Sequence, residues 1–529
     1  MNQKSPFLQT SAGMNLLKQS KKSLFRAVFS RTGLICCLLL INAGLLAVLF
    51  WRFSEFIPHY LSSNAVITVV MVLTILNSRH DPTSKITWLV IIMCSPLVGS
   101  ALYLYIRSDV GHRALKKRIR DLMLTTRDLL PQDPAAAAAF EETAPGAAGL
   151  ARYLRRTDYF STCAGTDAVY FPQGEDKFRR LLLELEQARE FIFLEYFIVE
   201  EGVMWGRILE ILARKAAQGV DVRVIYDGFC EFVLLPRDYP RMLNQLGISC
   251  KVFAPVMPFV STHYNYRDHR KIAVIDGHTA FTGGVNLADE YINVKSRFGH
   301  WKDTALMVKG EAARGFTLMF LQMWNLGEKH PDFDRFLTRP LPPVEGNGGF
   351  CIPYWDCPLD DRRVGQQVYM DILNRAKRYV HIMTPYLILD GEMENALKYA
   401  AERGVDVRLI LPGIPDKKMP YALAKTHYPS LMASGVRIYE YTPGFVHAKS
   451  FVCDDWEAVV GTINLDYRSL YHHFECAAYL HGADCIAAIE EDFQTTQNQC
   501  RRVTRETLRA EKWTTKLMGC LLKIVAPLL

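Results

Sequence analysis

The sequence predicts an α/β protein made of two similar halves that share one site, behind a group of apolar N-terminal segments. Three observations support this fold class. A short motif with fixed internal spacing occurs twice, an alternation of helix and strand signals occurs twice, and apolar runs precede both. The motif period is 178 residues, from His269 to His447. Because that period is too long for a solenoid repeat, it indicates duplication of a whole domain.

The motif is H-x-K-x4-D-x6-G-[G/T]-x-N. Its members after the histidine are Lys271, Asp276, Gly284 and Asn286 in the first copy, and Lys449, Asp454, Thr462 and Asn464 in the second. Side chains at positions i and i+2 of a strand point to the same face, so each histidine shares a face with a lysine. Two such strands brought together place two imidazoles and two ammonium groups around one small anion. Such a set supplies a nucleophile, an acid and cations for a phosphodiester.

Each half also repeats a pattern of alternating helices and strands before its motif. The sequence AQGVDVR at 217–223 matches ERGVDVR at 402–408. In each half a helical pattern ends at that glycine and an alternating apolar strand follows. A second helical pattern then ends at Gly247 or Gly435, before a short strand and the motif. This alternation is typical of parallel α/β construction.

The N-terminal part concentrates the apolar residues of a chain that is 50% hydrophobic and 22% charged. After a basic segment at 1–32, apolar runs follow at about 33–53, 56–76 and 86–106. Each has about the 20 residues that cross a bilayer core. A signal peptide is a poor alternative for the first run, which is too long and lacks a small-residue cleavage site. Buried core helices are the alternative for the other two, but close grouping and aromatic ends favour membrane spans.

The orientation in the membrane follows less directly. Basic clusters lie before the first run and after the third. The positive-inside rule places both clusters in the cytosol, but three membrane crossings would put them on opposite sides of the membrane. Either one run does not cross, or one cluster breaks the rule. Thirteen cysteines without the paired spacing of a disulfide framework favour a reducing compartment. We therefore expect a multi-pass protein of the cell membrane with its catalytic part on the cytoplasmic side.

The remaining segments complete the expected organisation: a connector at 107–150, the halves at 151–340 and 341–510, and a C-terminal amphipathic helix at 511–529. The connector begins with basic residues and becomes rich in proline and alanine. The last segment alternates lysines with large apolar residues, which gives one basic and one apolar face. Two uses of that helix stay open, namely packing on the domain and contact with a membrane surface.

These residues also carry a family resemblance, which runs from about Ser84 to the C-terminus. Both motif copies, YFP at 170–172, FLEYF at 193–197 and NYRDHRK at 265–271 resemble the bacterial cardiolipin synthases of the phospholipase D superfamily. The resemblance implies two phospholipase D-like α/β halves whose HKD motifs pair across a pseudo-twofold axis to build one active site. It also implies that the second and third apolar runs form a membrane hairpin.

The resemblance assigns a role to each histidine and lysine. A neutral imidazole attacks phosphorus, and a protonated one donates to the leaving alkoxide, which suits His269 and His447 near neutral pH. An isolated histidine is more often a core residue, but the doubled spacing argues against that here. Lys271 and Lys449 are expected to bind phosphoryl oxygens rather than serve as strand-surface lysines.

The polar residues after each histidine are assigned by the same resemblance. Asn286 and Asn464 resemble oxygen-binding amides. Gly284 and Thr462 stand where the family commonly has serine, so a contact at Gly284 would have to come from its backbone N–H. Asp276 and Asp454 complete the motif and are counted with the catalytic set, although such residues in the family are more often structural.

Two further carboxylates are expected to orient the histidines. Glu475 resembles the acid that fixes the tautomer of the active-site histidine, and we expect it to hold His447. Asp303 is its expected counterpart in the first half. A metal site is the competing chemistry, suggested by His263, His472 and His473. No spaced set of ligands accompanies those histidines, and the lysines make a divalent cation redundant, so we expect no metal and no cofactor.

The implied function is phosphatidyl transfer between two phosphatidylglycerol molecules, giving cardiolipin and glycerol through a phosphohistidine. One alternative is a membrane-bound phospholipase D-type phosphodiesterase or nuclease with water as acceptor, and another is an inactive lipid-binding scaffold. A nuclease needs a long basic groove with aromatic residues, and a net charge of +7 lying largely beside the membrane argues against it. The intact His–Lys pairs argue against a scaffold. The expected partners are therefore phospholipid and membrane rather than nucleic acid, and the oligomeric state stays open.

Overall fold

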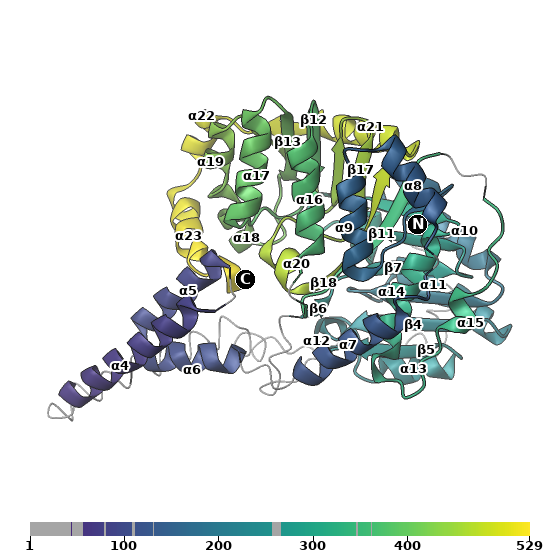
Figure 1. Cartoon of the computed structure of the whole chain (residues 1–529), viewed down its shortest axis with the longest axis horizontal. Coiled ribbons are helices and arrows are strands. Elements are labelled where there is room, and N and C mark those ends of the chain that lie inside the picture. The colour runs from purple at the N-terminus through teal and green to yellow at the C-terminus, as the bar shows by residue number, and fades with distance from the viewer. Residues whose placement is uncertain are drawn as a thin grey trace.

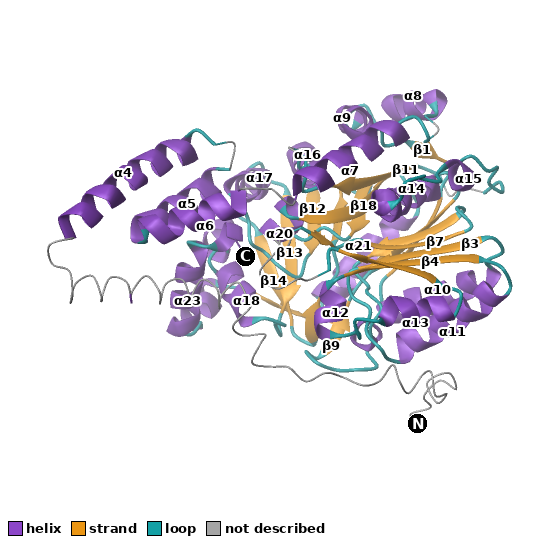
Figure 2. Cartoon of the chain, turned by 90° about the horizontal axis from the view of Figure 1, so that it is seen from below, coloured by secondary structure: helices purple, strands orange, loops and turns teal. Residues whose placement is uncertain are grey.

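The computed structural model describes residues 44, 57–78, 81–107, 112–130, 132–255, 266–344, 348–360 and 362–528. Two large β-sheets lie next to each other in the main body of the chain, and helices surround them (Figures 1 and 2). The α/β architecture with two halves is therefore confirmed.

The first half is built on a seven-stranded sheet with the order β2-β10-β8-β7-β3-β4-β5. Its strands are β2 (Asp167–Phe171), β3 (Phe191–Tyr196), β4 (Asp221–Asp227), β5 (Ser249–Phe253), β7 (Lys271–Ile275), β8 (Thr279–Gly283) and β10 (Ala305–Lys309). Its helices are α10 (Gly174–Gln187), α11 (Val203–Ala217), α12 (Phe229–Val233), α13 (Tyr239–Gln245), η4 (Asp289–Ile292), α14 (Ala312–Trp324), η5 (Asn325–Gly327) and α15 (Asp334–Leu337). Strands β3, β4 and β5 are parallel, as the alternating helices predict.

The second half is built on a larger sheet with the order β1-β11-β18-β17-β16-β12-β13-β14-β19. Its strands are β1 (Cys163–Ala164), β11 (Phe350–Asp356), β12 (Tyr379–Met383), β13 (Asp406–Pro412), β14 (Arg437–Tyr441), β16 (Ser450–Cys453), β17 (Glu457–Gly461), β18 (His473–His481) and β19 (Cys500–Arg502). Its helices are α16 (Val364–Arg375), α17 (Gly391–Glu402), α18 (Lys418–Lys425), α19 (Tyr428–Ala433), α20 (Tyr467–Tyr471) and α21 (Cys485–Gln497). From β11 to β14 the strand order repeats that of the first sheet strand for strand, which is the duplication seen in the sequence.

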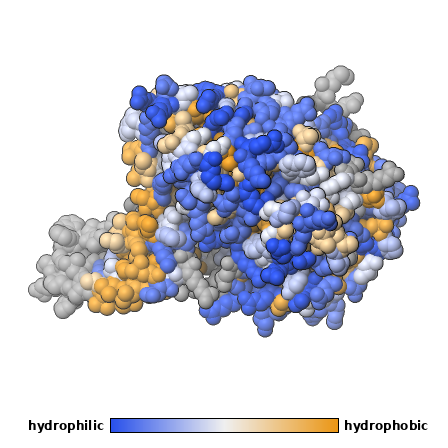
Figure 3. Space-filling model, turned by 45° about the horizontal axis from the view of Figure 1, so that its top comes forward, coloured by the Kyte–Doolittle hydropathy of each residue, from blue (hydrophilic) through white to orange (hydrophobic). Residues whose placement is uncertain are grey.

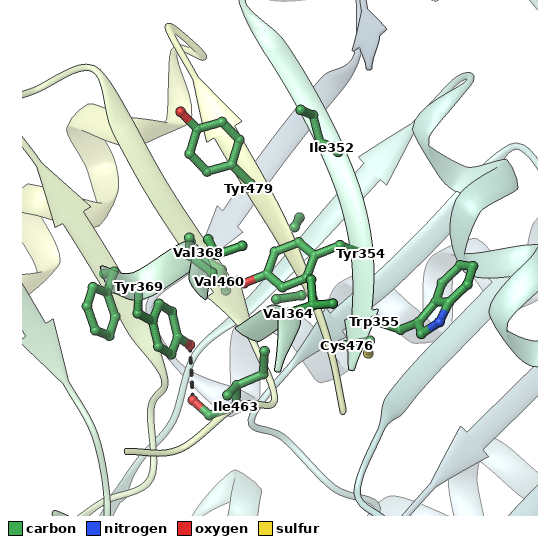
Figure 4. Packing of buried hydrophobic residues seen from close by; sticks show 14 of the residues in the cluster. Ile352, Tyr354, Trp355, Val364, Val368, Tyr369, Val460, Ile463, Cys476 and Tyr479 are labelled. Atoms are coloured by element: carbon green, nitrogen blue, oxygen red, sulfur yellow. Dashed lines mark hydrogen bonds between the residues drawn. The ribbon is translucent and has the colours of Figure 1, made fainter. Parts of the chain in front are cut away.

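The two halves share a core. Helix α14 lies so close to β11 that a Cβ on Gly315 would be 2.9 Å from Cβ of Pro353. A strand of the first half also contacts a helix of the second half: Tyr170 of β2 donates a 2.6 Å hydrogen bond to Asp492 of α21. One hydrophobic cluster continues from the first half into the second. Figure 4 shows a part of it in the second half, where the Tyr369 hydroxyl donates to the Ile463 carbonyl at 3.1 Å.

The segment expected to be a connector is part of this core. It forms α7 (His112–Thr126), α8 (Pro134–Thr143) and the first residues of α9 (Ala148–Asp158). Its buried side chains belong to the same hydrophobic cluster as the two halves: Ile119, Leu122, Leu130, Phe140 and Leu150. The compact unit therefore begins before residue 151, because these apolar residues recur at helical spacing inside a stretch that looks like a linker in composition.

The N-terminal helices correct one expectation directly. They are α4 (Ile57–Leu76), α5 (Pro82–Cys94) and α6 (Pro96–Arg107). The run expected to span the membrane at 86–106 is thus interrupted at Ser95, whose backbone leaves the helical region just before Pro96. Gly99 lets α6 fold back on α5, since a Cβ there would lie 2.9 Å from the Ile91 carbonyl oxygen.

Within the described part of the chain, no helix is both long enough and apolar enough to cross a membrane. The helix α4 coincides with the second expected span at 56–76. The basic segment at 1–32 and, apart from Gly44, the first expected span at 33–53 lie outside the described residues.

The C-terminal segment at 511–529 is helical, as expected, and contains α23 (Trp513–Lys523) and η6 (Ala526–Leu528). Helix α22 (Arg505–Ala510) precedes it at the end of the second half. Helix α23 packs on α18 through Gly519, where a Cβ would lie 2.5 Å from the Ala422 carbonyl oxygen. The first of the two open uses of this helix, packing on the domain, is therefore realised.

Candidate active site

Two short strand pairings join the halves at the site. Strand β6 (Arg267–Asp268) of the first half pairs with β18 of the second, and β15 (Gly444–Val446) of the second pairs with β9 (His300–Lys302) of the first. The ladders continue into the motifs. The backbone N–H of His269 donates to the Phe474 carbonyl at 2.9 Å, and that of His447 donates to the Lys302 carbonyl at 2.7 Å.

Because of these pairings, each histidine is held by a carboxylate of the other half. Nδ1 of His269 lies 2.9 and 3.0 Å from the two carboxylate oxygens of Glu475. Nδ1 of His447 lies 2.6 Å from Oδ2 of Asp303. The expectation that Glu475 holds His447 is therefore wrong, since β18 runs beside β6 and delivers Glu475 to the first motif. A carboxylate on Nδ1–H leaves Nε2 of the neutral ring free of a proton.

Asp303 and Glu475 are nonetheless counterparts in the two halves. Ala305 of β10 lies opposite Gly283, and Ala477 of β18 lies opposite Gly461. Each carboxylate comes two residues before the alanine of its strand. The two carboxylates thus occupy equivalent strand positions, and the histidine that each one serves differs from the expectation.

The two motif lysines are buried with the histidines and donate to the backbone carbonyls of His269 and His447. Burial lowers the pKa of Lys271 to about 8. Burial lowers the pKa of Lys449 to about 7, with a further decrease from Lys271 that Asp303 opposes. The site thus holds two ammonium groups that lose their protons far more readily than a solvated lysine does, and that gain from an anion placed between them.

The histidines are neutral in this environment. Burial, followed by the charge of Lys271, lowers the pKa of His269 well below its usual value. Burial and Lys449 lower the pKa of His447 to about 4, although Asp303 raises it. Cations of the second motif also act on His269, so the four motif groups form one electrostatic unit. A bound phosphate anion would raise all four pKa values.

The two asparagines differ in their partners. Asn286 accepts a hydrogen bond from the Ile198 N–H at 3.0 Å and donates to the Tyr291 hydroxyl at 2.8 Å. Its amide therefore braces the loop after β3. Nδ2 of Asn464 is 3.5 Å from Asp466, and its buried Oδ1 has no hydrogen-bond partner among the described residues. Of the two amides, that of Asn464 is the better placed to bind a further group.

The residues in the serine positions serve the carboxylates. A Cβ on Gly284 would lie 1.9 Å from Oδ1 of Asp303, so only glycine leaves room for that carboxylate. The Gly284 N–H, expected to contact substrate, instead donates to the Thr304 carbonyl at 3.0 Å. In the other half, the Thr462 hydroxyl donates to Glu475.

Asp276 and Asp454 have structural partners. Asp276 accepts hydrogen bonds from the backbone N–H groups of Arg189, Glu190 and Phe191, all at 2.9 Å. Asp454 does the same in the second half, with the N–H groups of residues 377–379. Both aspartates follow their motif strands with positive φ angles of 51° and 53°. They fix the turns that precede β3 and β12, and the structural alternative explains them better than the catalytic one.

A third histidine lies beside the first motif and was missed as a site residue. The rings of His473 and His269 have centroids 5.2 Å apart, and Nδ1 of His473 is 3.6 Å from Oε1 of Glu475. That nitrogen is buried, and no atom in the described part of the chain forms a hydrogen bond with it. The available signal was its position, two residues before Glu475 on one strand, which puts both side chains on the same face.

His269, His473 and Glu475 are also the kind of residues that bind metal ions, and their ligand atoms lie within 4.8 Å of one another. Their surroundings do not favour a divalent cation. Burial lowers the pKa of His473, and the charges of Arg468, Lys271 and Arg267 lower it further, so a cation is disfavoured there. The donor set therefore fits proton transfer and hydrogen bonding better than metal binding.

Comparison with known proteins agrees with this geometry. A family model for the phospholipase D-like domain of cardiolipin synthases matches residues 181–324 and 369–496, one stretch in each half. A second model, phospholipase D-nuclease N-terminal, matches residues 66–107. Cardiolipin synthases of Geobacillus kaustophilus and Halalkalibacterium halodurans are 33% and 32% identical, over 94% of this chain and 99% and 100% of theirs. An uncharacterized protein of Streptococcus mutans is 54% identical over 87% of this chain and 99% of its own.

A solved structure has the same fold. Phosphatidylserine synthase of Haemophilus influenzae superposes with a TM-score of 0.55, covering 72% of this chain and all of that one. At 14% identity this likeness concerns the fold alone. The doubled motif, the site at the interface of the halves and the relatives that match the chain almost end to end lead to one conclusion. The chain belongs to the cardiolipin synthase family of phospholipase D-like phosphatidyltransferases.

Proposed function

We propose that this protein transfers a phosphatidyl group from one phosphatidylglycerol to another, forming cardiolipin and releasing glycerol. The observation that carries the proposal is the crossed pairing of His269 with Glu475 and of His447 with Asp303. It provides two oriented imidazoles beside two buried lysines, which is the equipment for two successive displacements at one phosphorus. The names of the relatives supply the lipid class.

In the first step, Nε2 of His269 attacks the phosphorus of the donor lipid. The N–P bond forms as the bond from phosphorus to the glycerol oxygen breaks, and His447 gives that oxygen a proton. The bound phosphate anion raises the pKa of His447 from about 4, which allows the ring to carry this proton. Lys271 and Lys449 stabilise the charge that develops on the phosphoryl oxygens.

In the second step, a hydroxyl of another phosphatidylglycerol takes the position that glycerol has left. Its oxygen attacks the phosphorus, its proton goes to His447, and the N–P bond to His269 breaks. Two in-line displacements retain the configuration at phosphorus. The reaction exchanges one phosphodiester for another, so it needs no nucleotide to activate the donor.

The unequal support of the two histidines favours His269 as the nucleophile. Glu475 faces Nδ1 of His269 with both oxygens and accepts a further hydrogen bond from Thr462. Asp303 holds His447 through one oxygen, and Lys449 lies 3.0 Å from the same ring nitrogen. A phosphorylated imidazole carries positive charge, so the better-held carboxylate stabilises the adduct more.

The first test is product analysis. Purified protein with labelled phosphatidylglycerol should form cardiolipin and glycerol in equal amounts without ATP, a cytidine nucleotide or added metal. Phosphatidic acid as the main product would replace the proposal with hydrolysis. Loss of activity on treatment with a chelator would contradict the metal-free mechanism.

The second test traps the intermediate by acid quenching. His447→Ala should still form the labelled adduct slowly on His269, whereas His269→Ala should form none. Because Glu475 serves His269, Glu475→Gln should reduce adduct formation. Asp303 serves His447, which acts in both steps, so Asp303→Asn should slow both the formation and the breakdown of the adduct. Label on His447 of the wild-type protein would reverse the roles of the two histidines.

We further propose that the protein resides in the cell membrane, with its catalytic part on the cytoplasmic side. The exposed apolar side chains of the N-terminal helices support membrane attachment, among them Val66, Val69, Leu73 and Met93. A cysteine in place of Leu183, a residue of α10 that is 59% exposed, offers a test of the side. A membrane-impermeant thiol reagent should label Leu183→Cys in inverted vesicles and not in intact cells, with the unsubstituted protein as the control. Labelling in intact cells would place the domain outside.

A further inference from the structure

Helix α23 has a second apolar face besides the one that packs on α18. Its buried side is centred on Gly519, and Leu522 and Ala526 continue that side into a small cluster around Leu423. The opposite side leaves large apolar residues in solvent: Trp513 is 72% exposed, Leu517 50%, Leu521 59% and Ile524 43%. The first three are spaced i, i+4 and i+8, which puts them in one stripe. An already docked helix therefore still presents an apolar stripe.

The charged side chains of residues 512–528 are all positive. Lys512, Lys516 and Lys523 are exposed, and residues 512–528 include no aspartate or glutamate. A partner that matches this surface must be apolar where it contacts the stripe and anionic where it contacts the lysines. A second copy of the chain, stripe against stripe, would bring the lysines together. An anionic phospholipid surface satisfies both requirements.

The stripe adjoins the exposed apolar surface of the N-terminal helices. The Thr87 hydroxyl of α5 donates to the Ile524 carbonyl at 2.7 Å, and Leu528 packs on the cluster around Trp88. The hydrophobic surface gathers at this end of the molecule, over the N-terminal helices and the region beside them (Figure 3). The N-terminal helices and α23 thus form one continuous apolar surface.

We infer that α23 is a membrane contact of its own, which inserts its stripe into an anionic monolayer and places its lysines among the headgroups. The choice of a lipid rests on the proposed function, in which the substrate is itself an anionic phospholipid. The contact would lie near the site. Ala424 of α18 lines a small cavity with Tyr386 and Phe445, and the Phe445 ring is 5.9 Å from that of His447.

Photo-crosslinking of the full chain tests the contact without using catalysis. Benzoylphenylalanine would replace Leu517, Leu521 or, as the control, Leu183, a residue of α10 that is also 59% exposed. The protein would be reconstituted in phosphatidylcholine vesicles with and without phosphatidylserine. Lipid adducts are expected at 517 and 521 but not at 183, with a several-fold higher yield in the anionic vesicles. Absence of lipid adducts at both positions, or crosslinks to a second chain, would overturn the inference.

An activity comparison tests the consequence. Leu517→Gln with Leu521→Gln should lower the rate on phosphatidylglycerol vesicles roughly tenfold, because two leucines no longer enter the lipid. The rate on detergent-dispersed phosphatidylglycerol should stay within about twofold, and Leu183→Gln should change neither rate. An equal loss on both substrates would assign these leucines to the fold and refute docking. Lipid crosslinks together with phosphatidic acid as the main product would keep the docking surface and reject the proposed function.

Discussion

At the scale of single residues, the two halves hold equivalent carboxylates by different means. In the second half Thr462 donates a hydrogen bond to Glu475. In the first half Gly284 has no side chain to donate, and the carboxylate of Asp303 occupies the space where a Cβ would be. Gly284 and Asp303 in the first half are therefore the counterpart of Thr462 and Glu475 in the second half, and the two members of each pair depend on each other. Changing one member should disturb the histidine that the pair supports.

The first prediction concerns Gly284→Ser. Its Cβ would lie 1.9 Å from Oδ1 of Asp303, so the carboxylate must move away from His447. A displacement of about 1 Å in a catalytic constellation costs on the order of 10²-fold in rate. We expect kcat to fall by about that factor and the melting temperature to fall as well, because the Cβ would also lie 2.9 Å from the His447 carbonyl oxygen. The double variant with Asp303→Asn should be no slower than the slower single variant, because both act on one contact. Wild-type activity of Gly284→Ser would contradict this account of the site.

The second prediction concerns pH. The pKa of Lys449 is lowered to about 7 and that of Lys271 to about 8, so in the free enzyme both are cations at lower pH and become neutral as pH rises through this range. In the proposed mechanism these cations bind the phosphoryl group, so kcat/KM should fall between about pH 7 and 9. Lys449→Arg should be slower yet lose the part of this decline due to Lys449, since a guanidinium stays charged. A wild-type profile that is flat to pH 9 would contradict the assignment.

Fixed motif spacing was sufficient to predict the histidines and lysines, because the period of a strand dictates which side chains share a face. It was not sufficient to pair them with carboxylates. Asn464 precedes Glu475 by 11 residues and Asn286 precedes Asp303 by 17, so the counterparts do not align by spacing. The pairing depends on two short ladders between the halves, and such tertiary contacts leave no periodic signal.

At the scale of elements, hydropathy alone did not show that the run at 86–106 is divided between two helices. Pro96 was the available signal, because proline cannot donate the next hydrogen bond of a helix and restricts the residue before it. The structure accordingly ends α5 at Cys94 and starts α6 at Pro96. By contrast, the helices that end at a glycine and the strands that follow them were predicted correctly, since both signals are local.

The third prediction concerns the turn at the end of β16. Asp454 has a φ of 53° and accepts hydrogen bonds from the backbone N–H groups of residues 377–379 at 2.7–2.8 Å. Asp454→Ala should lower the free energy of unfolding in urea by about 1–3 kcal/mol, through lost hydrogen bonds and an unfavourable φ. Asp454→Asn should lose less, because asparagine tolerates this backbone. If kcat/KM per folded molecule fell more than about tenfold in Asp454→Asn, the residue would return to the catalytic set.

At the scale of the whole molecule, three parts of the sequence contribute to one core. The hydrophobic cluster includes Phe140 of α8, Phe316 of α14 and Leu480 of β18. The Phe140 ring lies 5.1 Å from that of Phe350 and 5.4 Å from that of His481, with both contacts edge-on. The domain boundary at residue 151 followed from composition, which marks alanine-rich and proline-rich stretches as linkers. The few apolar residues of that stretch carry the packing.

The last prediction compares two truncations. A protein that starts at residue 107 keeps α7, α8 and α9 and should unfold in one cooperative urea transition. A protein that starts at residue 151 uncovers the face on which Ile119, Leu122 and Phe140 pack, each worth about 1.5–3 kcal/mol when buried. It should lose more than about 5 kcal/mol of stability and bind a hydrophobic dye.

Phe140→Ala in the full chain is the matched control, with an expected cost of about 3–5 kcal/mol. Equal stability of the two truncated proteins would make residues 107–150 a connector after all. The outcome therefore decides whether the catalytic unit of this family member consists of the two halves alone or of the two halves together with the helices that precede them.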